Sequence, residues 1–316
     1  MNNQDSVKKI ECLPTIAISI GDLNGVGIEI ALRAHNEISK FCTPIYCINN
    51  HMLKQAAKLL NIAIPKGIQL QSVDGDFHIQ AGQIDAKSGR YSYDSFMSAI
   101  NLCETKKADA VVTMPINKES WMLGGLEYKG HTDLLRHHFK KDAIMMLGCE
   151  KMFVALYTEH IPLRDVPSFI KKDKLVDFFL NLHKSIPNEK IAVLGLNPHA
   201  GDNGVLGDEE IEINAAIQSA NAIIDKELFI GTIVPDVAFT PYTRKNFKYF
   251  VAMYHDQGLA PLKALYFDES VNISLNLPII RTSVDHGTAF DIAYKGKAET
   301  LSYHNAIKNA ILFMGK

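Results

Sequence analysis

Cysteine is scarce in this chain, and no two cysteines stand in a CxxC pair. The five thiols are Cys12, Cys42, Cys47, Cys103 and Cys149. An odd number without paired spacing argues against a disulfide framework and against a thiolate zinc site. The cysteine pattern therefore favours a protein of a reducing compartment, and we expect a cytoplasmic location.

An excess of one charge and a long apolar run are missing as well. The 33 Lys and Arg side chains nearly balance the 35 Asp and Glu, for a formal net charge of −2. No apolar run approaches the roughly 20 residues that span a bilayer. The opening MNNQDSVKKIECLP also lacks the apolar core of a signal peptide. We therefore expect neither nucleic acid nor a membrane as partner.

Short β-rich runs alternate with helical patterns along the 316 residues, 47% of which are hydrophobic. The predicted strands are 15–20, 44–49, 109–114, 152–158, 190–196 and 249–254. The predicted helices are 28–39, 92–107, 174–186, 208–224 and 301–314. This alternation predicts an α/β architecture with a largely parallel sheet that is covered on both faces. No repeat and no Pro- or Ser-rich linker divides the chain, so we expect crossing strands to join any two domains.

Polar segments that contain glycine follow the apolar runs at seven places. They are 21–29, 114–120, 130–135, 158–166, 197–210, 254–263 and 281–299. In open α/β sheets, ligands bind beyond the carboxyl ends of the strands. The pattern therefore predicts that one pocket collects these segments.

Three histidines share one context, because His160, His199 and His255 each closely follow an apolar run. Any one of them, taken alone, is more readily a satisfied polar side chain than a ligand. Their separations of 39 and 56 residues exclude a local zinc-finger arrangement but suit three strands that each deliver one imidazole. Three neutral imidazoles with an open position are an established catalytic arrangement for a divalent metal. The set therefore predicts a metal site.

A glycine-rich stretch follows the first predicted strand, but GDLNGVGIE (21–29) lacks the GxGxxG spacing of a dinucleotide-binding loop. A glycine-rich turn that leads into a helix can still offer backbone N–H groups to an anion. That signal alone does not assign a ligand.

Other candidates for anion binding lie further along the chain. His131 and Thr132 follow Gly130 and are placed to open a helix, in which Thr132 is a candidate N-cap. Lys263 and Arg281 are candidate ligands of a phosphate or carboxylate, Arg281 through two parallel hydrogen bonds. The competing interpretation places both cations in ion pairs at the surface.

Five segments, in this order, resemble blocks of the 4-hydroxythreonine-4-phosphate dehydrogenase family of pyridoxal phosphate biosynthesis: GHTDLL, NPHAGDNGVLGDEE, YHDQGLAPLK, VNISLNLP and RTSVDHGTAFDIAYKGKAE. The resemblance extends from Gly21 to Glu299, and HDQG and RTSVDHGTA are its most specific motifs. The segment DHGTAFDIAYKGKA is also similar to the cofactor segment of isopropylmalate and isocitrate dehydrogenases. Their fold has no GxGxxG loop, which accounts for its absence here.

The resemblance implies an isopropylmalate dehydrogenase-like fold of two α/β/α domains with a mixed, largely parallel sheet. It places the active site in the cleft between the domains. The first domain, on the cofactor side, would take residues 1–130 and 265–316, and the second, on the metal and dimer side, residues 131–264. The family is a homodimer whose active sites lie at the subunit interface and draw ligands from both chains.

The resemblance also implies a role for individual residues. The implied metal ligands are His160, His199 and His255, for zinc, magnesium or cobalt. The implied substrate contacts are His131, Thr132, Lys263, Asn272 and Arg281. Among the catalytic residues, Lys263 is the candidate for proton transfer, and Asp256 is the candidate that orients a ligand imidazole. Asp285, His286 and Gly287 are implied contacts of the cofactor, NAD or NADP.

The implied reaction is NAD(P)-dependent oxidation of 4-phosphohydroxy-L-threonine at C3, with decarboxylation to 3-amino-2-oxopropyl phosphate. The chain departs from the family in two motifs. In GDLNGVGIE, Leu23, Asn24 and Ile28 replace the family's usual Pro, Ala and Pro. In GHTDLLR, Asp133 replaces a Glu, and Leu135 and Arg136 stand where the family often has other residues.

Three rival functions are compatible with parts of this pattern. A dehydrogenase of a sugar-acid 4-phosphate, such as threonate or erythronate 4-phosphate, would keep the same metal and phosphate residues. A metal-dependent hydrolase is permitted by three histidines alone, although HGTAFDIA argues against it. A non-catalytic ligand-binding protein is disfavoured because every candidate catalytic position is filled.

Overall fold

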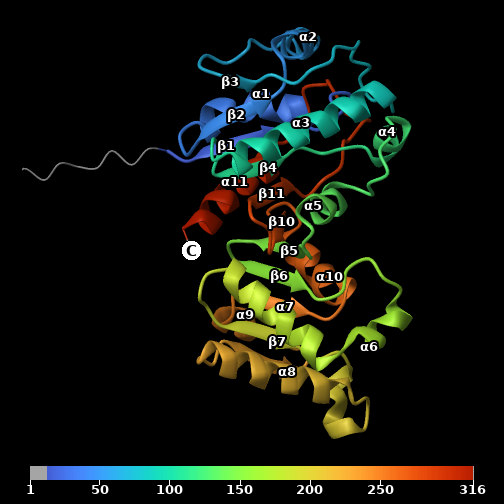
Figure 1. Cartoon of the computed structure of the whole chain (residues 1–316), viewed down its shortest axis with the longest axis vertical. Coiled ribbons are helices and arrows are strands. Elements are labelled where there is room, and N and C mark those ends of the chain that lie inside the picture. Colours follow the sequence, from blue (N-terminus) through green and yellow to red (C-terminus); the bar gives the residue numbers. More distant parts are fainter. Residues whose placement is uncertain (1–12, 316) are drawn as a thin grey trace, which may run out of the picture.

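The structure of the chain is a computed structural model that describes residues 13–315 (Figure 1). Cys12 and the N-terminal segment discussed above lie outside the described residues. The strands are β1 Thr15–Ser19, β2 Thr43–Cys47, β3 Gln69–Gln71, β4 Ala110–Thr113, β5 Ile144–Cys149, β6 Met152–Leu156, β7 Ile191–Leu194, β8 Phe229–Ile233, β9 Tyr249–Ala252, β10 Val271–Leu275 and β11 Ile280–Val284.

The α-helices are α1 Gly27–Ile38, α2 Asn50–Leu60, α3 Ala86–Glu104, α4 Lys118–Leu123, α5 His131–Phe139, α6 Val166–Phe169, α7 Lys172–Ser185, α8 Glu209–Ile224, α9 Pro241–Asn246, α10 His255–Tyr266 and α11 Leu301–Met314. Two 3₁₀ turns are η1 Leu163–Asp165 and η2 Pro198–Gly204. Among residues 13–315, none of these helices combines the length and the apolarity that a membrane crossing requires.

One mixed sheet of eleven strands runs through the described part of the chain in the order β3-β2-β1-β4-β11-β10-β5-β6-β9-β7-β8. Strands β1 to β4 and β11 are parallel, and so are β6, β9, β7 and β8. Between these two parts, β10 is antiparallel to both β11 and β5, and β5 is antiparallel to β6. The predicted α/β class with a mixed, largely parallel sheet is confirmed.

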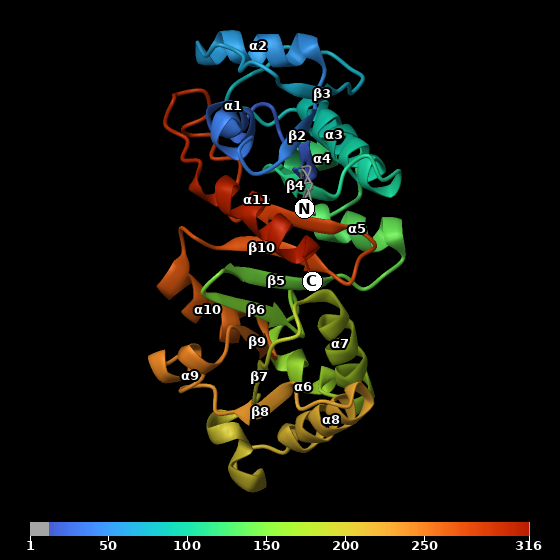
Figure 2. The ribbon, with the colours of Figure 1, turned by 90° about the vertical axis from the view of Figure 1, so that its left-hand side faces the viewer.

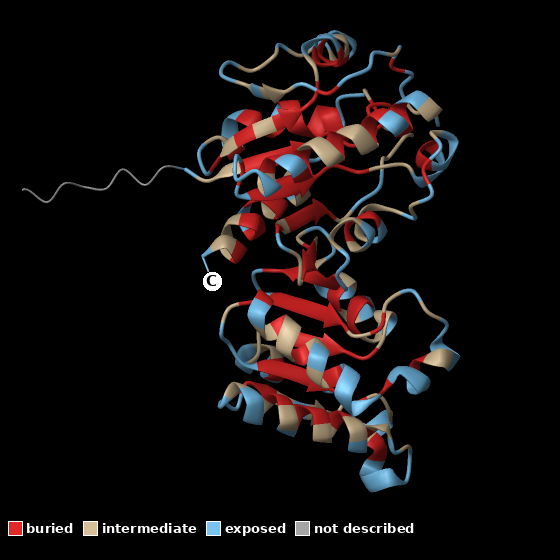
Figure 3. Cartoon of the chain, in the orientation of Figure 1, coloured by how far each residue is buried: buried red, intermediate tan, exposed pale blue. Residues whose placement is uncertain are grey.

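Helices cover both faces of the sheet, which explains why its strands read as continuous apolar runs. In Figure 2, α7 and α8 lie on one side of the strands of the second part, and α9 and α10 lie on the other. The strands are accordingly buried almost throughout (red in Figure 3). Ile16 to Ile18 in β1 and Ile191 to Leu194 in β7 are fully buried.

The two parts of the sheet are drawn from different stretches of the chain. The chain passes from the first part to the second after β4 and returns before β10, so β10 and β11 join the first part's strands late in the sequence (Figure 1). The domain limits given above, 1–130 with 265–316 and 131–264, stay a prediction. The four described cysteines are unpaired, which agrees with the absence of a disulfide framework.

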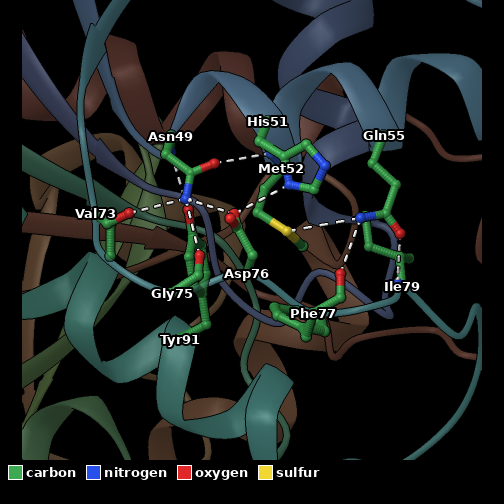
Figure 4. A network of polar contacts seen from close by, with 10 residues as sticks. All are labelled: Asn49, His51, Met52, Gln55, Val73, Gly75, Asp76, Phe77, Ile79 and Tyr91. Carbon is green, nitrogen blue, oxygen red and sulfur yellow. Dashed lines mark hydrogen bonds and ion pairs between the residues drawn. The ribbon is translucent and has the colours of Figure 1, made fainter.

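A polar network fixes the outer edge of the first part (Figure 4). Asn49 caps α2 by accepting a hydrogen bond from the backbone N–H of Met52, and its amide nitrogen donates to two carbonyls in the segment 73–79. Gln55 donates to a third carbonyl of that segment and accepts from one of its N–H groups. Two side chains thereby satisfy backbone groups of a segment that belongs to no strand or helix.

Helix α10 corrects one expectation from the sequence. The segment 254–263 was not among the predicted helices, because it reads as a polar, glycine-containing segment at a strand exit, but residues 255–266 form a helix that carries both His255 and Lys263. Gly258 lets this helix lie close to β6, because a Cβ there would be 2.5 Å from Val154 Cγ1. Leu259 and other buried residues of α10 pack against the same face of the sheet. The packing of α10 against the sheet therefore stabilises a helix here, although Gly258 in this segment is typical of a loop.

Candidate active site

A cavity of about 840 Å³ lies over the antiparallel centre of the sheet, where the two parallel parts meet. Its floor is formed by Met145 and Leu147 of β5, Asn272 of β10, and Arg281 and Ser283 of β11. Side chains two residues apart on a strand share a face, so this floor is one face of the sheet. Helices α5 and α10 and the exits of β6 and β9 provide the walls.

Most of the residues predicted for the site line this cavity. They are His131, Thr132, His160, His255, Lys263, Asn272, Arg281 and Asp285. His199, Asp256, His286 and Gly287 do not line it. His286 instead lines a second cavity of about 140 Å³, which shares His131 and Ser283 with the first. The structure thus gathers residues separated by up to 154 positions, from His131 to Asp285, in one place.

His131 opens α5, and its N-cap is Gly130. Thr132 therefore lies inside the helix, and its predicted role as the N-cap is wrong. Gly130 has φ 148°, a backbone conformation that only glycine adopts readily. The His131 ring packs edge-on against Phe96 and Trp121, at centroid distances of 4.7 and 5.7 Å. Its Nε2 is buried without a hydrogen-bond partner.

The pKa of His131 is lowered well below its ordinary value, chiefly by burial and secondarily by the positive charge of Arg281. We expect the neutral ring in the free protein, so its NMR signal should not titrate between about pH 5 and pH 8. The signal is identified by its absence from His131→Gln. A chemical shift that moved through this pH range would contradict the neutral form.

Arg281 is a buried cation whose hydrogen-bond partners are neutral. Only 2% of its surface is exposed, and its guanidinium donates to the hydroxyls of Ser274 and Thr113. Burial lowers the pKa of Arg281 to about 9, which leaves the side chain charged at neutral pH. No carboxylate pairs with it among the described residues. Such a cation is suited to an anionic ligand.

Four described residues that line the cavity each have a buried polar atom without a hydrogen-bond partner. These atoms are His131 Nε2, Arg136 Nε, Asn272 Oδ1 and Arg281 Nε. Buried polar atoms in native proteins are nearly always hydrogen-bonded, so exceptions that share a cavity call for an explanation. A polar ligand in the cavity would provide partners for such atoms.

Two of the three predicted metal ligands are adjacent. His160 follows β6 and His255 follows β9, its parallel neighbour, so both side chains leave the same edge of the sheet. Their ring centroids are 5.4 Å apart. Asp256 Oδ1 lies 2.7 Å from His255 Nδ1, which leaves Nε2 as the free nitrogen of that ring. Two neighbouring imidazoles, one of them oriented by a carboxylate, fit part of a divalent-metal site.

His199 lies apart from this pair. It is an exposed residue of η2 with φ 52°, in a left-handed run that continues to Asn203. Glu210 holds the start of this turn by accepting hydrogen bonds from the backbone N–H groups of Leu196 and Asn197. Within residues 13–315 of one chain, no three His, Cys, Asp or Glu side chains gather closely enough to hold a metal ion.

Two of the remaining predicted residues, Lys263 and Asp285, form an ion pair in the cavity. Lys263 Nζ donates to Asp285 Oδ2 at 3.0 Å, and both residues line the cavity. Asp285 directly follows β11, whereas His286 and Gly287 are exposed. A Cβ added at Gly287 would meet no atom within 4 Å, so a ligand can approach this backbone closely.

Two of the seven polar segments, 21–29 and 197–210, do not line the cavity, so one chain does not collect all seven as predicted. The first supports the predicted cofactor segment instead, because the N–H of Val26 donates to the carbonyl of Thr288. Asn24, which departs from the family motif, makes two hydrogen bonds to the backbone of the segment 80–83. Its amide nitrogen donates to the carbonyl of Gln83, and its amide oxygen accepts the N–H of Gln80. Asn24 thus ties the altered loop to the segment 80–83.

Five charged residues of the cavity were not named as site residues from the sequence: Lys118, Lys129, Asp133, Arg136 and Glu159. Of these, Asp133 was noted only as a departure from the family motif. Lys118 and Glu159 belong to polar segments that were noted, 114–120 and 158–166, but nothing local set them apart from ordinary surface charges. Arg136 was noted only as a departure from the family pattern. Arg136 and Glu159 form an ion pair although they are 23 positions apart in the sequence. This contact distinguishes them from ordinary surface charges, and only the tertiary structure shows it.

Comparison with known proteins gives consistent matches. The family described as "Pyridoxal phosphate biosynthetic protein PdxA" matches residues 40–310. The 4-hydroxythreonine-4-phosphate dehydrogenase of Sulfurimonas denitrificans is 71% identical over 296 residues, which cover 94% of this chain and 96% of that protein. The crystal structure of 4-hydroxythreonine-4-phosphate dehydrogenase from Klebsiella pneumoniae is 33% identical with a TM-score of 0.83, covering 95% of this chain and 99% of that one. A β-decarboxylating dehydrogenase from Thermococcus kodakarensis, 13% identical with a TM-score of 0.50 over 96% and 84% of the two chains, shares the fold.

Proposed function

The chain belongs to the PdxA family of pyridoxal phosphate biosynthetic proteins, and we propose from this that it oxidises 4-phosphohydroxy-L-threonine at C3 with NAD or NADP. Decarboxylation of the product then yields 3-amino-2-oxopropyl phosphate. The observation that carries the proposal is the set of unpartnered atoms of His131, Asn272 and Arg281 in one cavity with His160 and His255. A phosphorylated amino acid offers the anionic and polar atoms that this set lacks.

Arg281 anchors an anionic group of the substrate, because its charge is buried and paired only with neutral hydroxyls. Neutral His131 and the amide of Asn272 add hydrogen bonds around the same group, and Thr132 offers a hydroxyl at the start of α5. The anion therefore meets one buried charge and several fixed dipoles. Such an arrangement fixes the position and orientation of the substrate over the floor of the cavity.

His160 and His255 would hold the divalent metal of the site, and Asp256 would orient the His255 ring, whose Nδ1 lies 2.7 Å from Asp256 Oδ1. The third ligand, His199, would come from the second copy of a homodimer, since it lies away from the cavity of its own chain. When bound, a divalent ion supplies Lewis-acid stabilisation of the negative charge that develops on the C3 oxygen.

Lys263 moves the protons of the reaction, while Asp285 fixes its position through their ion pair. Oxidation transfers a hydride from C3 to the nicotinamide and releases the proton of the C3 hydroxyl. The resulting β-keto acid loses CO₂, and the electron pair left at C2 must then take up a proton. Lys263 is the group of the cavity suited to deliver that proton to C2.

The nicotinamide cofactor would lie beside Asp285, His286 and Gly287. His286 lines the smaller cavity, which adjoins the larger one through His131 and Ser283. The open space at Gly287 permits close approach of a ligand to the backbone. This placement brings the hydride acceptor next to the cavity that would hold C3.

Steady-state reduction of NAD and of NADP, measured with 4-phosphohydroxythreonine and with threonate 4-phosphate, tests the proposal. We expect turnover with the amino acid, its loss on chelation, and its return when zinc, magnesium or cobalt is added back singly. Turnover with threonate 4-phosphate alone would instead assign a sugar-acid dehydrogenase. Absence of any NAD(H) binding would point to the hydrolase alternative.

A further inference from the structure

The loop between β11 and α11 carries the implied cofactor contacts Asp285, His286 and Gly287, and its residues 285–300 form neither a helix nor a strand. We call it the cofactor loop. Backbone groups outside regular elements still need hydrogen-bond partners, so the position of such a loop depends on individual contacts. The cofactor loop finds these partners at α1, beside which it lies although the two are far apart in the sequence (Figure 2).

Two side chains of α1 hold the far end of the cofactor loop. Glu29 Oε1 accepts the backbone N–H of Ala298 at 2.9 Å. One turn later, Arg33 donates from one guanidinium nitrogen to the carbonyls of Gly296 and Ala298, at 3.2 and 2.7 Å. The same nitrogen lies 3.2 Å from Glu29 Oε1. We call this ion pair, with its three backbone contacts, the Glu29–Arg33 clamp.

The near end of the cofactor loop is held by the backbone of the turn before α1. The hydroxyl of Tyr294 donates to the carbonyl of Leu23 at 2.7 Å, and the N–H of Val26 donates to the carbonyl of Thr288 at 3.0 Å. Gly25 permits this approach, because a Cβ there would lie 2.9 Å from the carbonyl oxygen of Thr288. The glycine-rich stretch that the cavities do not use therefore holds the cofactor loop.

The clamp contains a buried charge. The Glu29 side chain is fully buried, whereas Arg33 is exposed, and Glu29 Oε2 is buried without a hydrogen-bond partner among the described residues. A buried carboxylate of this kind contributes little net stability, because apolar residues of similar volume often stabilise a fold as much as an ion pair does. A buried ion pair can instead specify one conformation of the groups that it contacts. Here those groups are backbone atoms of residues 296–298.

We infer that the Glu29–Arg33 clamp positions the cofactor loop for binding of the nicotinamide cofactor, so that Glu29 and Arg33 are positioning residues that determine cofactor affinity through this loop. The inference rests on the proposed function, which places the cofactor beside Asp285, His286 and Gly287. Affinity for a ligand falls in proportion to the fraction of molecules that hold the binding conformation. Neither clamp residue lines the larger cavity, so binding of the substrate's anion there does not depend on the clamp.

The test measures the dissociation constants of NADH and NADPH by fluorescence titration of the enzyme without substrate. Arg33→Met removes the contacts of the guanidinium with the loop and should weaken cofactor binding by about 10-fold or more. The KM for 4-phosphohydroxythreonine and the kcat at saturating cofactor should stay close to wild type. Arg33→Lys keeps a cationic donor and should restore part of the affinity.

The matched control is Arg90→Met. Arg90 is also paired with a carboxylate one turn away on its own helix, Asp94 of α3, but it makes no hydrogen bond to a backbone carbonyl within residues 13–315. Its replacement should leave cofactor affinity unchanged. Hydrogen exchange of the amides in the cofactor loop gives the structural readout, and it should be faster in Arg33→Met than in wild type and unchanged in Arg90→Met.

Faster exchange in Arg33→Met with unchanged cofactor affinity would overturn the inference, because the clamp would then support the fold alone. An equal loss of affinity for cofactor and substrate would overturn it as well. Glu29→Gln keeps an oxygen for the N–H of Ala298 and provides a second variant in case Arg33→Met fails to fold; it too should weaken the cofactor and spare the KM for the substrate. Failure of the wild-type enzyme to bind either NADH or NADPH is a separate result, because it overturns the proposed function itself.

Discussion

Replacement of His255 by alanine should lower kcat/KM for 4-phosphohydroxythreonine by about a thousandfold or more and remove most of the bound divalent metal. His255 and His160 are the two predicted metal ligands that lie together at the cavity, with their ring centroids 5.4 Å apart. Loss of either histidine leaves one predicted metal ligand from this chain at the cavity. Metal content by elemental analysis and steady-state reduction of NAD measure the two effects together.

A matched control is His51→Ala, which removes an imidazole that is also paired with an aspartate, Asp76, at the surface of the first part. This variant should keep both its metal and its turnover. Undiminished metal and turnover in His255→Ala would remove the assignment of His255 as a ligand. Loss of turnover with full retention of the metal would assign His255 to the substrate instead.

The sequence could predict that His160 and His255 lie close together, because the direction and order of the strands determine where the residues at their ends lie. Each histidine ends a short apolar run, and β6 and β9 are parallel neighbours, so both exits lie at one edge of the sheet. The same reasoning places His199 beside them, since β7 is also a parallel neighbour of β9. The left-handed turn after β7 takes His199 elsewhere, and no short-range pattern encodes that direction.

The floor of the cavity was less accessible to prediction from the sequence. Asn272 and Arg281 lie inside strands β10 and β11 and not at strand exits, where polar residues were expected. Their strands were not predicted because polar residues interrupt them, as in VNISL and IRTSV. Polar side chains of these strands face the cavity. Apolar and polar residues therefore alternate along them as in a half-buried strand, but this alternation can be recognised only once the cavity is known. Asn272 was identified only through the family resemblance, whereas Arg281 was also a candidate ligand of an anion on its own, and periodicity identified neither.

The second large effect concerns Arg281, whose replacement by methionine should weaken substrate binding by about 100- to 1,000-fold while making the free protein more stable. In the folded chain, burial lowers the pKa of Arg281 from its ordinary value to about 9. Below pH 9 both the folded and the unfolded states hold this proton, so the penalty for burying the charge is constant at neutral pH. Between pH 9 and the unfolded pKa the unfolded state binds more protons, and stability should rise with pH in that window.

Thermal melting with and without inorganic phosphate tests both halves of this prediction. The wild-type melting temperature should rise when phosphate is added, because an anion compensates the buried charge of Arg281. Arg281→Met should melt higher than wild type without phosphate, by an amount equivalent to about 1 kcal/mol or more, and respond little to phosphate. Arg244→Met is the control, because Arg244 bonds to Phe239 and Tyr266 away from the cavity. It should melt lower than wild type and keep the response to phosphate. If Arg281→Met melted lower and still responded, the buried guanidinium would be a structural group and not the anchor of the substrate's anion.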